Sequence, residues 1–241
     1  MTGRESAGRS LEGLPFEVQR LILGKAPSLD ELRTLIRASP QLYRVYVEDR
    51  PRILRAFISN LLEDIILDAH AAYVSGEDIF QSNRGHAMLW EFLDDFRQRR
   101  DFEAPAALAA RLSEKQLIGI IRYHASVIEP LTDRYTAWAT ATLASPPQEL
   151  KYELEEWPLT SIRDMDRRRI QRAFYHFQLF CNVSGRRVSH SSGRSSCIHD
   201  PSECWRVLTI FPEYQFEAIR CVHTFARMRI MILSTGSDSS L

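Results

Sequence analysis

The sequence predicts an all-α protein, and two observations support that prediction. Apolar residues recur at the three- and four-residue spacing of amphipathic helices through most of the 241 residues. Alternation of apolar and polar residues over several positions is absent, and turn residues do not occur at the spacing of β-hairpins. We therefore expect helices packed on helices, in a short three-helix unit followed by a larger irregular helical domain.

The three-helix unit is predicted over residues 11–50, after a disordered tail over residues 1–10. Its first helix starts at Pro15, and its second at Ser28, an N-cap with Glu31 three residues later as a capping-box partner. The third helix begins at Ser39-Pro40, which repeats the cap-then-proline start. Apolar faces are expected at Leu14, Val18, Leu21 and Ile22, at Leu29, Leu32, Leu35 and Ile36, and at Leu42, Tyr43, Tyr46 and Val47.

The larger helical domain is predicted over residues 51–233. Its first helix, with apolar residues every four positions from Ile53 to Ala69, should be buried and run for about six turns. The polar stretch Ser75–Gly85 breaks the periodicity, and Pro130 should end or kink the helix before it. Further helical patterns cover Met88–Phe96, Ser113–Ile128, Leu131–Leu143, Asp164–Cys181, Cys204–Phe211 and Glu213–Ile230.

Two segments of this region are predicted to lack regular structure. Ser, Gly and Arg dominate residues 184–196, which predicts a flexible loop, and a disordered tail is expected over residues 234–241. On the last helix, the inner side is expected to carry Phe216, Ile219, His223 and Ala226.

Composition and charge exclude several classes of function. The chain has 31 Lys+Arg and 31 Asp+Glu, so it lacks the cation excess of a non-specific nucleic-acid binder. The sequence contains no run of about 18 uncharged apolar residues, which a membrane-spanning helix would need. It also has no apolar segment behind the N-terminus, which an export signal would need. The four cysteines are too few for a disulfide framework. We therefore expect an intracellular protein, cytoplasmic or nuclear, that binds neither nucleic acid nor membrane.

Motifs of the common enzyme classes are missing from the sequence. There is no Gly-Lys-Ser/Thr phosphate loop and no Gly-x-Ser-x-Gly nucleophile elbow. Neighbouring carboxylates such as Asp94-Asp95 would point about 100° apart on a helix and would not form an acid/base couple. The histidines in apolar helical patterns, His86, His124, His176 and His223, are interpreted as structural. We therefore expect no enzymatic activity, no catalytic residue and no cofactor.

A metal site is one alternative. The zinc-type ligands His190, Cys197, His199 and Cys204 lie within fifteen positions of the sequence. No Cys-x-x-Cys or His-x-x-x-His pair fixes them, and only one residue separates Cys197 from His199, which is an uncommon chelate. A metal-binding protein that uses residues 190–204 therefore stays an alternative rather than the main prediction, which assigns no metal ligand.

One serine lies in a sequence context that basophilic kinases accept. Ser189 follows Arg186-Arg187 by two residues, in the predicted loop. A phosphate there would add nearly two negative charges beside arginines and could order the loop. Phosphorylation at Ser189 is therefore a prediction.

The predicted three-helix unit carries a family resemblance. It reads Leu14-Pro15-x-Glu17-Val18 with Ile22-Leu23, then Leu29-Asp30-x-Leu32-x-x-Leu35, then Arg37-Ala38-Ser39-Pro40 and Tyr43. This pattern resembles the degenerate F-box-like start of a large group of filamentous-fungal proteins. Looser similarity to segments of the same group is found at Arg169–Asn182 and Phe211–His223.

The resemblance implies a function in protein–protein interaction. F-box modules bind a Skp-type adaptor and so join a cullin-based ubiquitin ligase, while the rest of the chain recruits an unknown target protein. The adaptor-binding residues that the resemblance implies are Leu14, Pro15, Val18, Ile22, Leu23, Leu35, Ser39 and Tyr43. In the alternative interpretation, these residues only close a hydrophobic core, and the protein is a helical scaffold with no role in a ligase.

Overall fold

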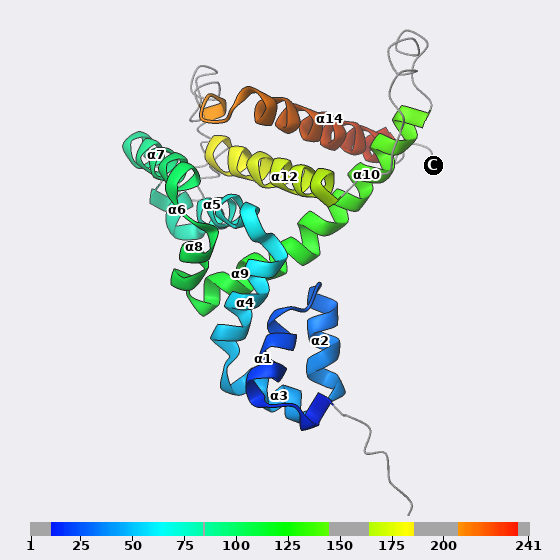
Figure 1. Ribbon diagram of the computed structural model, residues 1–241. Coiled ribbons are helices and arrows are strands. Elements are labelled where there is room, and N and C mark those ends of the chain that lie inside the picture. The colour runs from blue at the N-terminus through cyan, green and yellow to red at the C-terminus, as the bar shows by residue number, and fades with distance from the viewer. Residues whose placement is uncertain (1–10, 84, 145–163, 186–206, 236–241) are drawn as a thin grey trace, which may run out of the picture. The chain divides into compact units, whose positions relative to one another are not determined.

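The computed structural model describes residues 11–83, 85–144, 164–185 and 207–235, and these residues form helices and no strand, which confirms the all-α prediction (Figure 1). In that part of the chain, no helix combines the length and the apolar character that crossing a membrane requires. The elements are η1 (Leu11–Gly13), α1 (Phe16–Gly24), α2 (Leu29–Ala38), α3 (Pro40–Glu48), α4 (Arg50–Leu62), η2 (Glu63–Ile65), α5 (Ile66–Gly76), α6 (Asp78–Asn83), α7 (His86–Phe102), α8 (Pro105–Arg111), α9 (Glu114–Tyr123), the π-helical turn η3 (His124–Ile128), α10 (Glu129–Ala144), α12 (Asp164–Ser184) and α14 (Glu213–Thr235).

The chain divides into two compact units, and each is formed by two separate stretches of sequence. Unit 1 comprises residues 1–66 and 103–125, and unit 2 comprises residues 67–102 and 126–241. The predicted boundary at residue 50 does not coincide with this division. Helix α4 packs against α1 and α3, and α8 and α9 pack against α4, so the first three helices share their core with later elements.

Local sequence signals explain how the helices of unit 1 begin. Ser28 Oγ accepts a hydrogen bond from the Glu31 amide at the start of α2. At the start of α3, Ser39 Oγ accepts from two backbone amides and Pro40 occupies the first helical turn. Ser113 and Gln116 form a complete capping box at the start of α9. These three predicted helix starts are confirmed.

The interior of unit 1 is built from leucine and isoleucine. The buried apolar side chains come from every one of its α-helices and include Leu23, Leu32, Leu42, Val45, Ile53, Phe57, Ile58, Leu108, Leu117, Ile120 and Ile121. Helix α8, which contributes Leu108, was not expected from the sequence, because a seven-residue helix is too short to establish a period.

The predicted six-turn helix after Pro51 is interrupted in the structure. Helix α4 ends at Leu62, Glu63 adopts φ 42° and ψ −112°, and the 3₁₀ turn η2 leads into α5. The apolar residues on both sides of the break are buried, including Leu62, Ile65 and Ile66. The four-residue period therefore predicted the burial of these residues correctly. It did not predict that the backbone changes conformation between α4 and α5.

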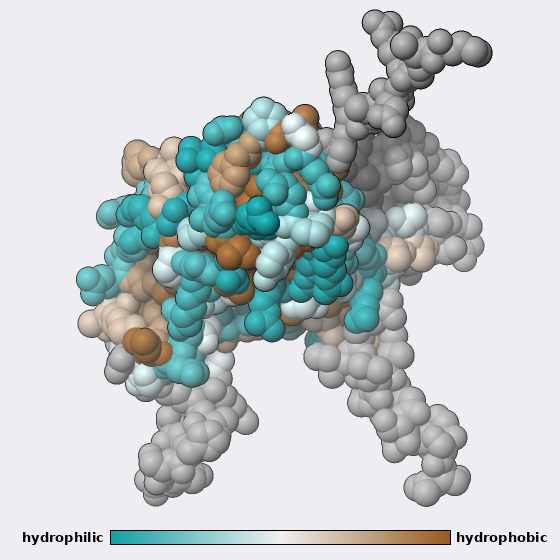
Figure 2. Space-filling view, turned by 90° about the horizontal axis from the view of Figure 1, so that it is seen from below, coloured by the Kyte–Doolittle hydropathy of each residue, from teal (hydrophilic) through white to brown (hydrophobic). Residues whose placement is uncertain are grey.

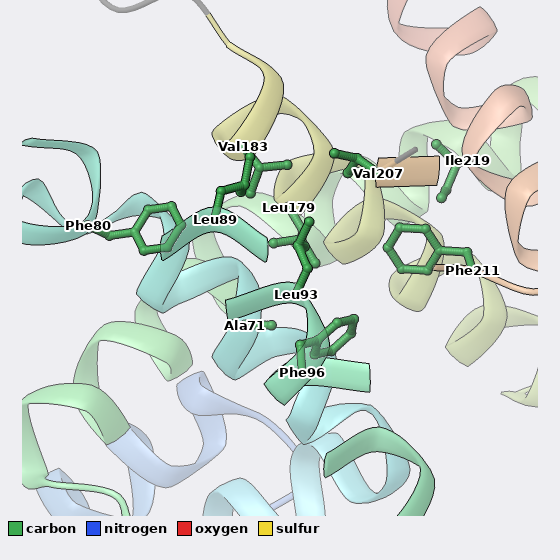
Figure 3. Packing of buried hydrophobic residues seen from close by; sticks show 10 residues of the cluster. All are labelled: Ala71, Phe80, Leu89, Leu93, Phe96, Leu179, Val183, Val207, Phe211 and Ile219. Atoms are coloured by element: carbon green, nitrogen blue, oxygen red, sulfur yellow. The ribbon is translucent and has the colours of Figure 1, made fainter. Parts of the chain in front are cut away.

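In unit 2, α12 and α14 lie side by side (Figure 1). Both helices confirm the sequence prediction, and α14 runs to Thr235, into the predicted tail. A hydrophobic cluster joins α12 and α14 to α5, α6 and α7 (Figure 3). Its buried members are Ala71, Phe80, Leu89, Leu93, Phe96, Leu179, Val183, Val207, Phe211 and Ile219.

Three sequence expectations for unit 2 need correction. Residues 75–85 contain the short helix α6, which buries Phe80 and leaves Ile79 exposed. The described part of residues 204–211 leaves the helical conformation after Leu208. His223 is exposed, while the buried face of α14 carries Gln215, Ile219, Val222 and Phe225.

The helix containing Pro130 changes type just before the proline. The π-helical turn η3 separates α9 from α10, and Pro130 lies in the first turn of α10. A proline has no N–H to donate, so position 130 cannot give the backbone hydrogen bond that continues a regular helix. The helix does not end at Pro130 but continues through it as α10, after the change of helix type.

Candidate functional site

The residues ahead of α1 are fixed by a buried glutamine. Gln19 is fully buried, and its Nε2 donates to the carbonyl oxygens of Leu11 (3.2 Å), Glu12 (3.1 Å) and Leu14 (3.0 Å). Three acceptors on one amide group hold the backbone of residues 11–14 against α1. Sequence analysis missed this residue, because a polar side chain within an apolar pattern does not by itself indicate burial.

Ser39 performs a second structural task besides capping α3. It is buried, and its Oγ donates to Glu12 Oε1 over 2.6 Å while accepting from the amides of Gln41 and Leu42. One hydroxyl therefore ties the segment before α1 to the start of α3. Its hydrogen-bonding capacity is used within unit 1, so Ser39 is not part of an exposed adaptor surface.

The other predicted adaptor-binding residues divide by exposure. Leu23 is fully buried within unit 1, so it offers no surface to a partner in this structure. Half-buried positions are Leu14, Ile22 and Leu35, and exposed positions are Pro15, Val18 and Tyr43. Six of the eight predicted residues therefore have surface that a partner could cover.

Two exposed apolar residues extend this surface. Leu21 on α1 is 60% exposed and Val47 on α3 is 55% exposed. Leu21 lies three residues after Val18, and Val47 lies four residues after Tyr43, so each pair shares a helix face. Helices α1 and α3 pack against each other, and we refer to their four exposed apolar residues, Val18, Leu21, Tyr43 and Val47, as the α1–α3 apolar surface.

The sequence predicted Leu21 and Val47 as members of apolar helix faces, and in the structure both are exposed. The inner positions of α1 are Gln19 and Leu23, and those of α3 are Leu42 and Val45. Both helices are apolar on two sides, so the periodicity alone could not tell the inner side from the outer. Figure 2 shows the molecule from below, with hydrophobic side chains interspersed among hydrophilic ones.

Ion pairs brace the helices that carry the surface. Arg20 Nη1 lies 3.1 Å from Asp49 Oδ2, and both side chains are at most a quarter exposed. This pair joins α1 to Asp49, the residue between α3 and α4. The more exposed pair of Arg50 and Glu114 joins α4 to α9 and contributes little in water.

A buried polar cluster in unit 2 was not predicted from the sequence. The Asp68 carboxylate of α5 accepts from Arg172 Nε (3.1 Å) and from His176 Nε2 (2.7 Å), both on α12. Asp68 and His176 are at most 3% exposed. More than a hundred residues separate Asp68 from its two partners, so no local pattern could have indicated the cluster.

Two potential nucleophiles of unit 2 are shifted away from their reactive forms. Burial raises the pKa of Tyr135, and the neighbouring Cys221 thiol raises it further. Burial also raises the pKa of the Cys181 thiol. Both shifts favour the protonated form, so neither side chain is prepared as a nucleophile.

The remaining candidate residues fall in different parts of the chain. Ser189 and the four zinc-type residues, His190, Cys197, His199 and Cys204, lie outside the described residues. Within the described ranges, no group of three or more His, Cys, Asp or Glu residues could hold a metal ion. His124 is buried, as a structural histidine would be.

Comparison of the chain with protein-family models, with curated proteins and with solved structures finds no match.

Proposed function

We propose that this chain is a non-enzymatic, intracellular protein-interaction protein in which α1–α3 bind a Skp-type adaptor. Through that adaptor it would act as a substrate-recruiting subunit of a cullin-based ubiquitin ligase. The observation that supports the proposal is the α1–α3 apolar surface, which lies on the same helices as the F-box-like sequence pattern. Neither nucleic acid nor membrane is among the proposed partners.

Exposure of apolar side chains to water on α1 and α3 is energetically unfavourable. Val18, Leu21, Tyr43 and Val47 are each between 37% and 60% exposed on two adjacent helices. Burying one such side chain completely is worth roughly 1.5–3 kcal/mol. These side chains are already about half buried, so a partner that covers the remainder gains part of this energy for each of them.

The motif residues have separate tasks in this proposal. Leu23 and Ser39 maintain the packing of α1 and α3, while Leu14, Pro15, Ile22 and Leu35 surround the four exposed residues. Helices of unit 2 would then be available for the target protein. The proposal does not identify that target.

A helical scaffold without a ligase role is the second candidate function. The observation that favours it is the burial of Leu23 and Ser39, because these two motif residues contribute to the core and to helix capping. In that case the F-box-like pattern would be retained for folding alone.

Adaptor binding by the full chain tests the proposal. The purified Skp-type adaptor of a filamentous fungus would be titrated into the full chain, into Leu21→Asp/Val47→Asp, and into the control Ile79→Asp/Phe102→Asp. Both control residues are at least as exposed as Leu21, and the charge change is the same. We expect the wild type and the control to bind, and the α1–α3 variant to bind at least about 10-fold more weakly.

The other outcomes are equally informative. If the wild type does not bind, the ligase role is wrong and the scaffold function is the better candidate. If both variants bind as the wild type does, the adaptor does not use this surface. Circular dichroism and thermal unfolding of both variants show whether each still folds.

A further inference from the structure

Unit 2 contains a cavity of about 570 Å³ between α12 and α14. Helix α12 contributes Arg169, Arg172 and His176, which are three and four residues apart and so share one face. Helix α14 contributes Tyr214 and Gln215. The small side chains of Ala173 and Ala218 leave the space between the helices open. Cavities of roughly 300–1,000 Å³ are the usual size for small-molecule sites.

Two arginines, Arg169 and Arg172, line the cavity. The described lining residues include no carboxylate, and the Asp68 carboxylate balances the charge of Arg172. Asp68 holds Arg172 through Nε and His176 through Nε2, as described above, so these two side chains are oriented before any ligand binds. A guanidinium group stays charged at any physiological pH and presents up to five donors in a plane. The site is therefore suited to a carboxylate or phosphate group.

A buried glutamine provides an independent indication of a ligand. Gln215 is 8% exposed, and its Nε2 donates to Tyr214 Oη over 3.2 Å. Its Oε1 is buried and has no hydrogen-bond partner in the described part of the chain. A buried acceptor without a donor destabilises a protein, so such groups normally have a partner. Because Gln215 lines the cavity, a bound molecule with an N–H or O–H group could supply that partner.

We propose that this cavity binds a small organic acid that carries a hydrogen-bond donor. The acid group, a carboxylate or a phosphate, contacts Arg169 and Arg172, and an N–H or O–H of the same molecule donates to Gln215 Oε1. The inference is independent of the proposed adaptor binding, because every described residue involved belongs to unit 2.

Calorimetric titration of the full chain with three probes tests the ligand chemistry. L-glutamate and glutarate differ by one ammonium group, which adds a hydrogen-bond donor and a positive charge. The extra net negative charge of glutarate favours its binding beside arginines, so a preference for L-glutamate would report the donor to Gln215. O-phospho-L-serine replaces one carboxylate of L-glutamate by phosphate. We expect millimolar or tighter binding of L-glutamate or O-phospho-L-serine. A preference for one of them distinguishes carboxylate from phosphate.

We also expect glutarate to bind at least about 5-fold more weakly than L-glutamate, because it lacks the hydrogen bond to Gln215. Absence of binding by both amino acids at millimolar concentration would overturn the proposal, as would equal binding of L-glutamate and glutarate.

Two variants test the residues. Arg169→Gln removes an exposed cation of the cavity, and Arg33→Gln makes the same charge change on α2 in unit 1. We expect Arg169→Gln to weaken binding of the preferred probe by about 10-fold or more, since it removes a charge-assisted contact, and Arg33→Gln to have no effect. Equal effects of the two variants would show a general influence of net charge and would contradict the proposal.

Gln215→Met conserves volume and removes the unpartnered acceptor. We expect this variant to lose the preference for L-glutamate over glutarate without a lower midpoint of thermal unfolding. A glutamine with only a structural role would give the opposite result, namely a lower midpoint and an unchanged preference.

Discussion

Gly24 shows how one missing side chain positions a helix in unit 1. A Cβ atom at this position would lie 2.8 Å from Ala56 Cβ, closer than two such carbon atoms approach in proteins. Gly24 ends α1, and Ala56 lies within α4, so the contact occurs where these two helices pack. The short methyl group of Ala56 cannot rotate away, which makes the close approach specific for glycine.

We expect Gly24→Ala to lower the free energy of unfolding by about 1–3 kcal/mol, because α1 and α4 must separate to admit the methyl group. Alanine is the better helix former, so local propensity alone predicts the opposite sign. Urea denaturation measures the change. Gly13→Ala is the matched control, since a Cβ there meets no atom within 4 Å. Equal stability of the two variants would contradict this account of the packing.

At the scale of single residues, the sequence predicted those features that depend on interactions between residues close together in the chain. The caps at Ser28, Ser39 and Ser113 could be predicted because the hydroxyl bonds to amides two or three residues away. The burial of Gln19 and the exposure of Leu21 could not, because both depend on which side of α1 meets the other helices. Of the eight predicted adaptor-binding residues, Leu23 and Ser39 are therefore buried, while the other six are half-buried or exposed.

The backbone conformation of Glu63 ends α4 and separates it from α5. Glu63 has φ 42° and ψ −112°, a backbone conformation that L-residues with a Cβ rarely adopt. Glycine has no such restriction, so the glutamate stores conformational strain at this position. Its amide donates to the Ser59 carbonyl and thereby closes the last turn of α4.

We expect Glu63→Gly to raise the free energy of unfolding by about 1 kcal/mol, because the backbone strain is relieved. The adjacent variant Asp64→Gly serves as the control. Asp64 has no positive φ, so glycine there should lower the stability by about 0.5–1 kcal/mol. Thermal unfolding followed by circular dichroism compares the two variants. Destabilisation by Glu63→Gly equal to that by Asp64→Gly would show that the break carries no strain.

Long helices with a regular period were the elements that could be predicted best. Helices α9, α12 and α14 agree with the sequence prediction because each buries one continuous face. The short helices α6 and α8 were missed, since six or seven residues contain too few repeats of the period. The break at Glu63 was missed because a glutamate gives no turn signal.

On the scale of the whole molecule, the first three helices depend on later sequence. Leu23, Leu42 and Val45 are buried in unit 1, where α4 packs against α1 and α3. Without α4, these side chains lose much of their cover. A chain of about 40 residues also buries too little surface to be stable without further support.

We therefore expect a fragment comprising residues 1–50 to lack cooperative thermal unfolding, in contrast to the full chain. Circular dichroism as a function of temperature makes the comparison. A sigmoidal transition of the fragment would mean that the three helices fold alone and that residue 50 is a true domain boundary.

The fold class could be predicted for the whole chain, but the division into units could not. Helical periodicity is a property of neighbouring residues, so it revealed an all-α protein. Residues 103–125 join residues 1–66 through packing of α8 and α9 on α4, a contact between distant segments. The cavity between α12 and α14 was beyond prediction for the same reason, since Arg172 is oriented by Asp68 on α5.

The discontinuous composition of unit 1 has a consequence during protein synthesis. Residues 1–66 leave the ribosome first, but unit 1 is complete only when residue 125 has been made. At a translation rate of roughly 5–20 residues per second, the intervening synthesis takes about 3–12 seconds. During that interval the side of α4 that packs against α8 and α9 lacks its cover, and exposed apolar surface of this kind makes a nascent chain prone to aggregation.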